Sequence, residues 1–272
     1  MKPHRIVLCA DDYGLSPGVS RGIRDLLAAG RLSAASCMVV YPEFEIEGPL
    51  LAPHFGQADI GLHFTLTADR SATSLMREAY FRGLNKDLVG AELERQLAAF
   101  QAVLGRTPDY IDGHQHVHLF PGVREPVVAA ARRLGAYVRS TREPIGRAMV
   151  RRASPVEAAF LSWTAEPLQR LIEQFALPTN RGFRGVRTFR EATPYRTLFL
   201  RMIEQAPPGC LVMSHPGSAD DALARRDRVT VQREDELRYF AGAEFPRDLA
   251  NAGLVLSRLR DALADVPKTQ QS

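Results

Sequence analysis

The sequence predicts an α/β fold built on a parallel sheet, and three observations favour it. Short apolar runs alternate with segments of helical periodicity. The runs are rich in β-branched residues, as is typical of strands that are buried on both faces. At least four runs end in polar or charged residues. Such endings suit a closed (β/α) barrel better than an open doubly wound sheet, because all strands of a barrel end at one mouth.

The predicted strands are the short apolar runs. The first run, residues 6–10, leads directly into Asp11 and Asp12. These carboxylates either lie at the ligand-binding edge of the sheet, or they cap the next helix or stay in solvent. The other predicted strands span residues 32–40, 59–67, 110–118, 136–139, 210–217 and 254–256.

Helices are predicted where apolar residues recur every three or four positions. The clearest is 88–104, which Gly105 ends. In segment 146–175, Pro155 must lie at a helix start or at a kink. Segment 68–86 has weak periodicity and predicts a long loop beside the site. The other predicted helices span residues 19–29, 123–134, 197–205, 233–240 and 245–249.

Composition limits the classes of protein that the chain can represent. With 272 residues, 45 % of them hydrophobic, and no linker, the chain predicts a single domain over 1–265 and a polar tail over 266–272. The net charge of +4 comes from scattered arginines. Without a basic stripe interleaved with aromatic residues, nucleic acid is not expected as a partner. No glycine-rich phosphate-binding motif follows the first strand.

Location and assembly are also expectations from sequence. The chain shows neither a signal peptide nor an apolar run long enough to span a membrane, which predicts a cytoplasmic protein. Cys9, Cys37 and Cys210 each lie in an apolar run and are predicted to be reduced, buried thiols. A homodimer is the expected assembly.

Histidines are scarce, and most of them follow the predicted strands. If the strand that begins at residue 110 stays extended to 118, its alternate residues from Asp112 onward share one face. Burying several imidazoles and carboxylates together is costly, and a divalent metal relieves that cost. The histidines that follow strands are His63, His114, His116, His118 and His215.

One carboxylate and two imidazoles would leave coordination positions open for water and substrate, as in catalytic metal sites. The adjacent Asp11 and Asp12 could supply one ligand and one general base. His215, which precedes the rigid Pro216, could be the general acid. The pattern therefore predicts metal-assisted hydrolysis.

Four motifs resemble those of the YdjC-like carbohydrate deacetylases, which include chitooligosaccharide deacetylases and proteins of hopanoid biosynthesis. The resemblance runs from about residue 5 to 258, in the order of the family. The motifs are Ala-Asp-Asp-Tyr-Gly-Leu-Ser from residue 10, Ile-Gly-Leu-His-Phe-Thr-Leu-Thr from 60, Asp-Gly-His-Gln-His-Val-His from 112 and Ser-His-Pro-Gly from 214.

The resemblance implies a distorted (β/α) barrel that removes the acetyl group of an N-acetylated amino sugar with one divalent metal ion, zinc or magnesium. By position, Asp12, His63 and His114 are implied as the metal ligands. Asp11 is implied as the base that activates water, and His215 as the general acid.

Six further positions have open roles. Asp112, His116 and His118 either orient a ligand imidazole or line the sugar cleft. Arg139 and Glu143 either hold sugar hydroxyls or form a structural ion pair. Tyr13 stands where the family more often has Phe, which adds a hydroxyl near the metal that could touch substrate.

The sequence does not identify the acetylated acceptor. Segment 147–193 resembles the family least, and substrate-discriminating residues are expected there. A glycolipid substrate would bring the chain to a membrane surface, where Arg181 and Arg184 would meet anionic headgroups. Two alternatives stay open, a metal-independent glycoside hydrolase and a non-catalytic protein that binds a sugar or a glycolipid.

Overall fold

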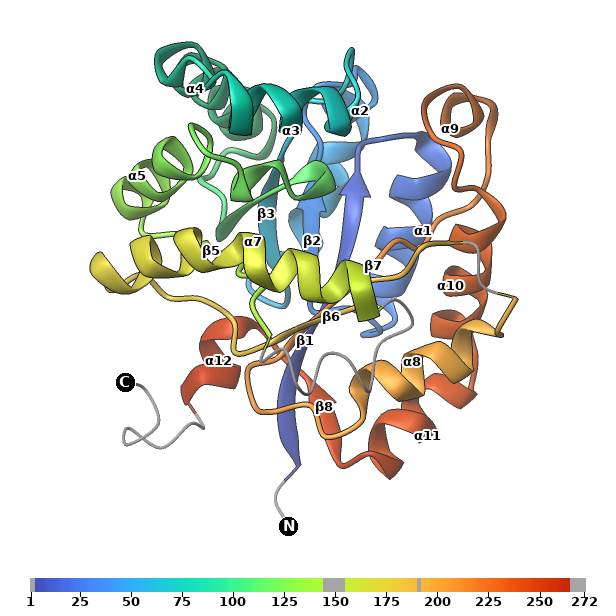
Figure 1. Cartoon of the computed structure of the whole chain (residues 1–272). Coiled ribbons are helices and arrows are strands. Elements are labelled where there is room, and N and C mark those ends of the chain that lie inside the picture. Colours follow the sequence, from blue (N-terminus) through green and yellow to red (C-terminus); the bar gives the residue numbers. More distant parts are fainter. Residues whose placement is uncertain (1–2, 144–154, 190–191, 265–272) are drawn as a thin grey trace.

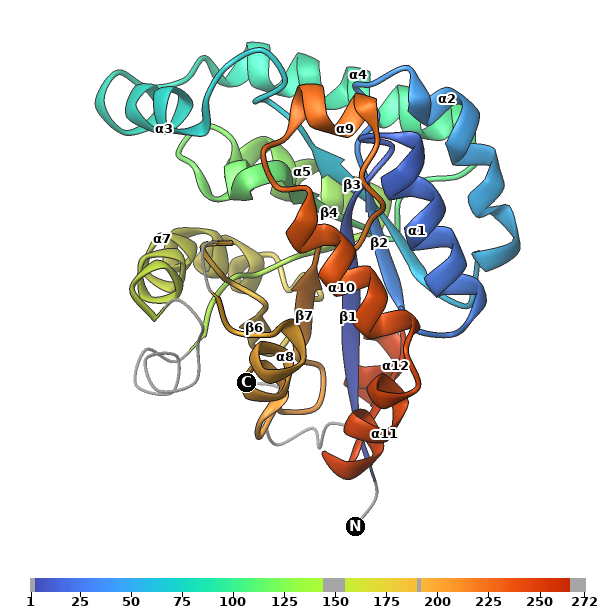
Figure 2. The same ribbon diagram turned by 90° about the vertical axis from the view of Figure 1, so that its right-hand side faces the viewer.

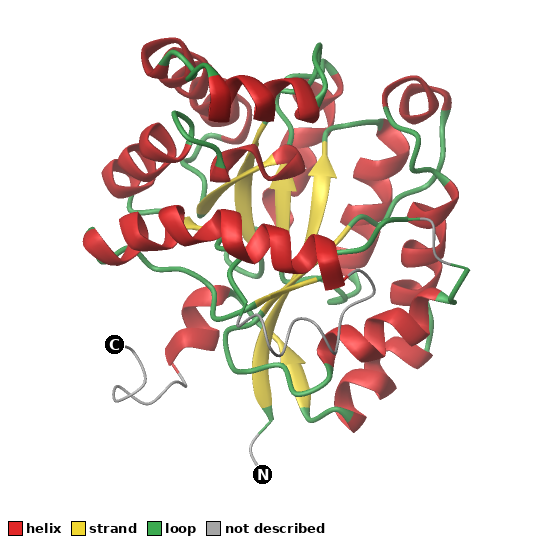
Figure 3. Cartoon of the chain, viewed as in Figure 1, coloured by secondary structure: helices red, strands yellow, loops and turns green. Residues whose placement is uncertain are grey.

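A computed structural model of the chain describes residues 3–143, 155–189 and 192–264. At its centre is an eight-stranded parallel sheet in the order β5-β4-β3-β2-β1-β7-β6, with β8 beside β1 (Figure 1, Figure 3). Among the described residues, no pairing joins β5 to β6, so the sheet curls without closing. This confirms the predicted distorted barrel. The strands are β1 His4–Tyr13, β2 Ala34–Cys37, β3 Asp59–Phe64, β4 Tyr110–Gly113, β5 Tyr137–Val138, β6 Phe183–Arg184, β7 Leu211–Ser214 and β8 Leu254–Leu256.

Strand β1 lies between β2 and β7 in the sheet (Figure 2), and β8 is its third neighbour. On one edge, the main chain of His4 and Ile6 bonds to the chain around β8, and that of Leu8 bonds to the segment entering β2. On the other edge, Arg5 and Val7 bond to the segment entering β7. Because β1 has neighbours on both edges and is buried from Ile6 onward, its carboxyl end lies in the middle of the fold.

The helices cover the sheet from outside, and local signals in the sequence explain where several begin and end. Helix α1 begins after Ser16, whose hydroxyl accepts from the Val19 amide at 3.2 Å. Helix α4 begins after Asn85 and ends at Gly105, where φ is 67°. The helices are α1 Pro17–Ala28, α2 Glu43–Glu47, α3 Ala72–Phe81, α4 Lys86–Leu104, α5 Arg124–Leu134, α7 Pro155–Gln174, α8 Tyr195–Ile203, α9 Asp221–Arg226, α10 Val231–Ala241, α11 Glu244–Asn251, α12 Leu259–Ala264, and the 3-10 helices η1 Gly48–His54 and η2 His114–Leu119.

Most predicted elements are present, with shorter strands than expected. Pro155 begins α7, in agreement with the expected helix start. The predicted loop over 68–86 was wrong, because it contains α3. Strand β6 and helices α9 and α12 were not predicted. The expected helical residues 146–154 and the tail 266–272 lie outside the described residues.

The structure also places the three cysteines and shows how long and how apolar the described helices are. Cys9, Cys37 and Cys210 are buried and free, as expected. Among the described helices, none is both long and apolar enough to cross a membrane.

Candidate metal and catalytic site

Asp11 and Asp12 lie on a β-bulge at the carboxyl end of β1. Between Ala10 and Tyr13, β1 has one residue more than the facing part of β2, and Asp12 has a φ of 72°. In a regular strand, two consecutive side chains point to opposite faces. Here both carboxylates lie near one atom, His63 Nε2, with Asp12 Oδ1 at 3.3 Å and Asp11 Oδ2 at 4.0 Å. The bulge therefore brings two adjacent acids to the same site.

The three predicted metal ligands converge. Asp12 Oδ1 lies 3.3 Å from His63 Nε2 and 3.1 Å from His114 Nδ1. The ligand atoms of this triad all lie within 4.8 Å of one another. One carboxylate oxygen and two imidazole nitrogens are a donor set that suits zinc and other transition ions, and three protein ligands leave positions open. The residues present therefore fit a catalytic divalent ion.

The His63 ring is oriented by Asp112. His63 Nδ1 lies 2.7 Å from Asp112 Oδ1, which places a proton on Nδ1 and leaves Nε2 facing the triad. Burial lowers the pKa of His63, but the carboxylates of Asp112 and Asp11 outweigh burial and raise it to about 10. The surrounding acids thus favour a positive charge at this position, whether a proton or a metal ion supplies it.

Asp11 is held by Arg139, which follows β5 and is completely buried. Arg139 Nη1 donates to Asp11 Oδ2 at 2.8 Å, and Nη2 donates to Oδ1 at 2.6 Å. The same Nη2 lies 2.6 Å from Asp112 Oδ2. Burial raises the pKa of Asp11, but the positive charge of Arg139 outweighs burial. The pKa of Asp11 is therefore well below its ordinary value. Asp11 is therefore ionised, and Arg139 pairs with Asp11 and Asp112, whereas the ion pair considered from the sequence was with Glu143.

Glu143 lies in a different ion pair. Its carboxylate is 2.9 Å from Arg184 Nη2 and accepts from the Phe183 amide at 3.1 Å. Arg184 is 2 % exposed and also donates to the Met202 carbonyl. The expectation that Arg184 meets lipid headgroups is therefore wrong.

The His-rich segment does not continue as a strand. Strand β4 ends at Gly113, and Gln115 and His116 have φ of 52° and 59°. The prediction that alternate residues of 112–118 share one face is therefore wrong. The three histidines belong to the 3-10 helix η2 and contact different parts of the fold. The His116 ring packs edge-on against Phe183, with centroids 5.7 Å apart. His118 is completely buried, and its Nε2 lies 3.1 Å from the Arg139 carbonyl oxygen.

Tyr13 points away from the acids. Its hydroxyl donates to the Glu47 carbonyl at 2.5 Å and accepts from Arg24 at 3.3 Å. Gly14 follows with a φ of 93°, and a Cβ there would lie 2.5 Å from the Met38 carbonyl oxygen. The turn after the acids therefore requires glycine, and the expected hydroxyl near the metal lies instead against the end of α2.

His215 follows β7. Its main-chain amide donates to Glu236 Oε2 at 2.6 Å, and its ring lies edge-on to Phe189 with centroids 5.4 Å apart. Burial lowers the pKa of His215, although the charges of Asp12 and Asp11 act in the opposite direction. The imidazole is therefore neutral near pH 7.

Sequence reasoning missed the charged residues of α10 that support the site. Arg233 lies 2.6 Å from Asp12 Oδ2, and Glu236 accepts from the His215 amide. Both side chains are buried and lie three residues apart, on the face that α10 turns to the core. Charged residues at core-facing positions of a predicted helix were the available signal.

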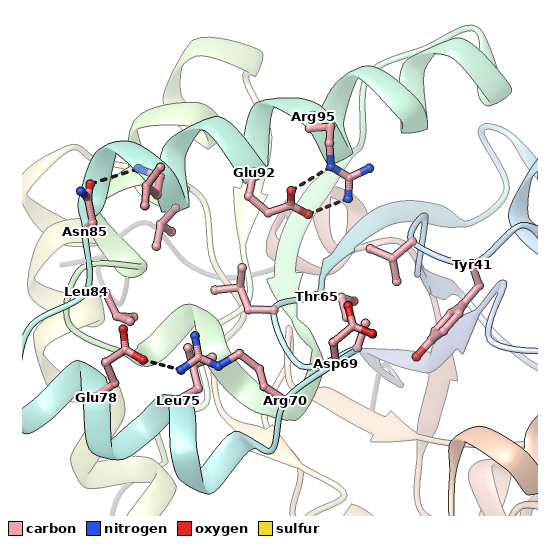
Figure 4. A pocket seen from close by; sticks show the side chains of 15 residues that line it. Tyr41, Thr65, Asp69, Arg70, Leu75, Glu78, Leu84, Asn85, Glu92 and Arg95 are labelled. Atoms are coloured by element: carbon pink, nitrogen blue, oxygen red, sulfur yellow. Dashed lines mark hydrogen bonds and ion pairs between the residues drawn. The ribbon is translucent and has the colours of Figure 1, made fainter.

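Two cavities are lined by residues that closely follow His63 and His114 in the sequence. The first, of about 670 Å³, lies between α3, α4 and the end of β3 (Figure 4). Thr65, two residues after His63, lines it, and the pairs Arg70–Glu78 and Arg95–Glu92 lie on its walls. The second, also about 670 Å³, is lined by residues 67–73 with Gln115 and Arg228. Gln115 directly follows the proposed ligand His114 in the sequence.

Comparisons with known proteins identify relatives along most of the chain. A mouse protein named carbohydrate deacetylase is 32 % identical over 246 residues, covering 78 % of each chain. A carbohydrate deacetylase from Geobacillus stearothermophilus is 27 % identical and covers 95 % of this chain and 98 % of its own.

A solved structure and a family model complete the comparison. A protein from Enterococcus faecalis, provisionally described as a cellobiose-phosphate cleavage protein, superposes with a TM-score of 0.72 at 18 % identity, over 95 % of this chain and 98 % of its own. At that identity it shows a shared fold. The model of the family described as YdjC-like protein matches residues 5–251. The chain therefore belongs to the YdjC-like family.

Proposed function

We propose that this chain is a metal-dependent carbohydrate deacetylase, which hydrolyses the N-acetyl group of an amino sugar and releases acetate. The observation that carries the proposal is the convergence of Asp12 Oδ1, His63 Nε2 and His114 Nδ1 beside a second, ionised carboxylate, Asp11. The names of the mouse and Geobacillus relatives, both carbohydrate deacetylases, support an acetylated carbohydrate as substrate.

A divalent ion held by Asp12, His63 and His114 would polarise the acetyl carbonyl and lower the pKa of a coordinated water to about 7. The two imidazoles favour zinc or another transition ion, whereas magnesium prefers oxygen ligands. We therefore propose zinc ahead of magnesium.

Asp11 would accept the proton of the attacking water. Arg139 contacts both oxygens of Asp11 and keeps the carboxylate ionised, so Asp11 can accept a proton and would readily pass it on. His215 is neutral near pH 7, and during the reaction it would take up the proton that Asp11 has accepted from the water. It would then deliver that proton to the departing sugar nitrogen, which completes general acid–base catalysis.

The two cavities, which Thr65 and Gln115 help to line, would hold the rest of the substrate, either a chitooligosaccharide-like chain or a glycolipid-linked sugar. We further propose that the chain acts as one domain over 1–265 in the cytoplasm. Peripheral membrane contact would accompany only a glycolipid substrate.

The test is acetate release from a panel of N-acetylated sugars and glycolipids, with and without chelator. Wild type is compared with Asp11→Asn and with Asp59→Asn, a buried aspartate at the opposite end of β3. Release should require metal and fall by about 10²–10⁴-fold in Asp11→Asn, as expected for loss of a general base. Release that survives both chelator and Asp11→Asn would contradict the proposal. Metal binding without release from any substrate would indicate a binding protein.

A further inference from the structure

Arg233 is a buried arginine on α10 that contacts a proposed metal ligand directly. Its Nη2 lies 2.6 Å from Asp12 Oδ2 and 2.6 Å from Asp227 Oδ2. Its Nε donates to the Val229 carbonyl at 3.1 Å. The side chain is 2 % exposed. These contacts fix the guanidinium in one place, between the end of β1 and the loop that leads into α10.

The two oxygens of Asp12 contact different groups. Arg233 donates to Oδ2, whereas Oδ1 faces His63 Nε2 and His114 Nδ1. The terminal torsion of an aspartate is soft and roughly twofold, so a free carboxylate samples many orientations. A donor fixed on Oδ2 removes that freedom and keeps Oδ1 aimed at the triad.

The same helix also supports the segment that carries His215. The Gly217 amide donates to the Arg233 carbonyl at 3.2 Å. One turn further along α10, Glu236 accepts from the His215 amide and pairs with Arg187 at 2.6 Å. Helix α10 therefore reaches both the metal-binding end and the proposed acid of the site (Figure 2).

We propose that Arg233 is a positioning residue for the metal ligand Asp12, and that Asp227 keeps Arg233 in place. This inference rests on the proposed metal site. Two effects of Arg233 oppose each other, since it orients Asp12 but its positive charge repels a dication. Asp227 contacts the same nitrogen and offsets that charge, so orientation dominates and loss of Arg233 weakens metal binding.

The experiment titrates metal-free protein with Co²⁺ and Zn²⁺ by calorimetry and records the visible absorption of bound Co²⁺. Arg233→Met should weaken affinity for both ions by about 10–100-fold, the usual effect of losing a group that orients a ligand. It should also alter the Co²⁺ spectrum. Arg233→Gln keeps a donor for Asp12 and should recover part of the affinity. Asp227→Asn should also weaken affinity for both ions, but by a smaller factor. If Arg233→Met does not fold, Asp227→Asn is the variant that tests the inference.

The matched control is Arg258→Met. Arg258 also lies between two aspartates, at 2.7 Å from Asp59 and 3.3 Å from Asp109, but at the opposite end of the sheet. This variant should unfold at lower temperature with unchanged metal affinity. Equal or tighter binding in Arg233→Met than in wild type would overturn the inference, and tighter binding would show that repulsion dominates. If wild type itself binds neither ion, the proposed metal site fails rather than the role of Arg233.

Discussion

The two ends of the sheet each hold an arginine between two aspartates, yet they are built for different purposes. At the amino end, Arg258 occupies Oδ1 of Asp59 at 2.7 Å, and the Leu259 amide donates to Oδ2 at 2.8 Å. At the carboxyl end, Arg233 occupies only Oδ2 of Asp12. The other oxygen of Asp12 faces two imidazoles instead.

We propose that the difference distinguishes a structural carboxylate from a metal ligand. Burial raises the pKa of Asp59 despite its donors. Burial acts in the same direction on Asp12, but Arg233 and His114 hold the pKa of that carboxyl well below its usual range. An ionised carboxylate with one oxygen aimed at imidazole nitrogens is suited to a metal. Asp59, which has both oxygens bonded to donors that follow β8, joins elements of the fold.

The largest expected effect comes from removing the ligand itself. Loss of a residue that only orients a metal ligand lowers activity by up to about 100-fold. Asp12→Ala removes the proposed ligand itself and should lower acetate release by more than that. Metal titration of the variant should show weakened or lost binding. Asp59→Ala, its counterpart at the amino end, should keep metal affinity and lose stability. Full metal affinity in Asp12→Ala would contradict the proposal that Asp12, unlike Asp59, is a metal ligand.

A smaller effect is expected from the group that orients His63. Asp112→Asn weakens the hydrogen bond to His63 Nδ1, so affinity for Co²⁺ should fall by about 10–100-fold. Asp109→Asn, at the amino end, is the control and should leave Co²⁺ affinity unchanged. If the two variants bind Co²⁺ alike, Asp112 does not orient a ligand.

At the amino end the expected effect is on stability. Arg258→Met leaves the buried Asp59 without its charge partner and should lower the free energy of unfolding by about 3 kcal/mol, the low end for a broken buried pair because Arg258 is partly exposed. Urea unfolding measures this, and acetate release per folded molecule should not change. An unchanged midpoint would mean that the amino-end ion pairs do not support the fold.

The smallest expected effect concerns the thiols in the core between the two ends. Burial raises the pKa of Cys9 to about 12, although Arg139 opposes the shift. Cys37 and Cys210 are buried as well. A thiol reagent should therefore label none of the three in the folded protein and all of them in denaturant. Rapid labelling under native conditions would contradict the packing around Cys9.

Much of the fold could be predicted because buried parallel strands are nearly continuous apolar runs. Strand β8 was predicted with its observed bounds, and α4 within two residues of its start. The weakly periodic α3 was missed, because few of its residues are buried and its pattern is faint. Strand β6 was missed because two residues are too few to produce a pattern.

The residue types of the site could be predicted, but their geometry could not. Asp12, Gln115 and His116 all have positive φ, which is unusual for residues other than glycine. No local sequence pattern predicts these backbone conformations. Arg139 pairs with Asp11 and Arg233 pairs with Asp12, and both of these partners lie far away in sequence, on β1. Those contacts depend on the order of strands in the sheet, which sequence periodicity does not give.

The most direct test of the central claim is the metal content of the purified chain, measured together with acetate release after chelation and after restoring Zn²⁺ or Co²⁺. The claim predicts one ion per wild-type chain, loss of release on chelation and recovery on restoring the ion. It also predicts neither bound ion nor release in His114→Ala. Acetate release by fully metal-free protein, or an ion retained in His114→Ala at wild-type affinity, would contradict it.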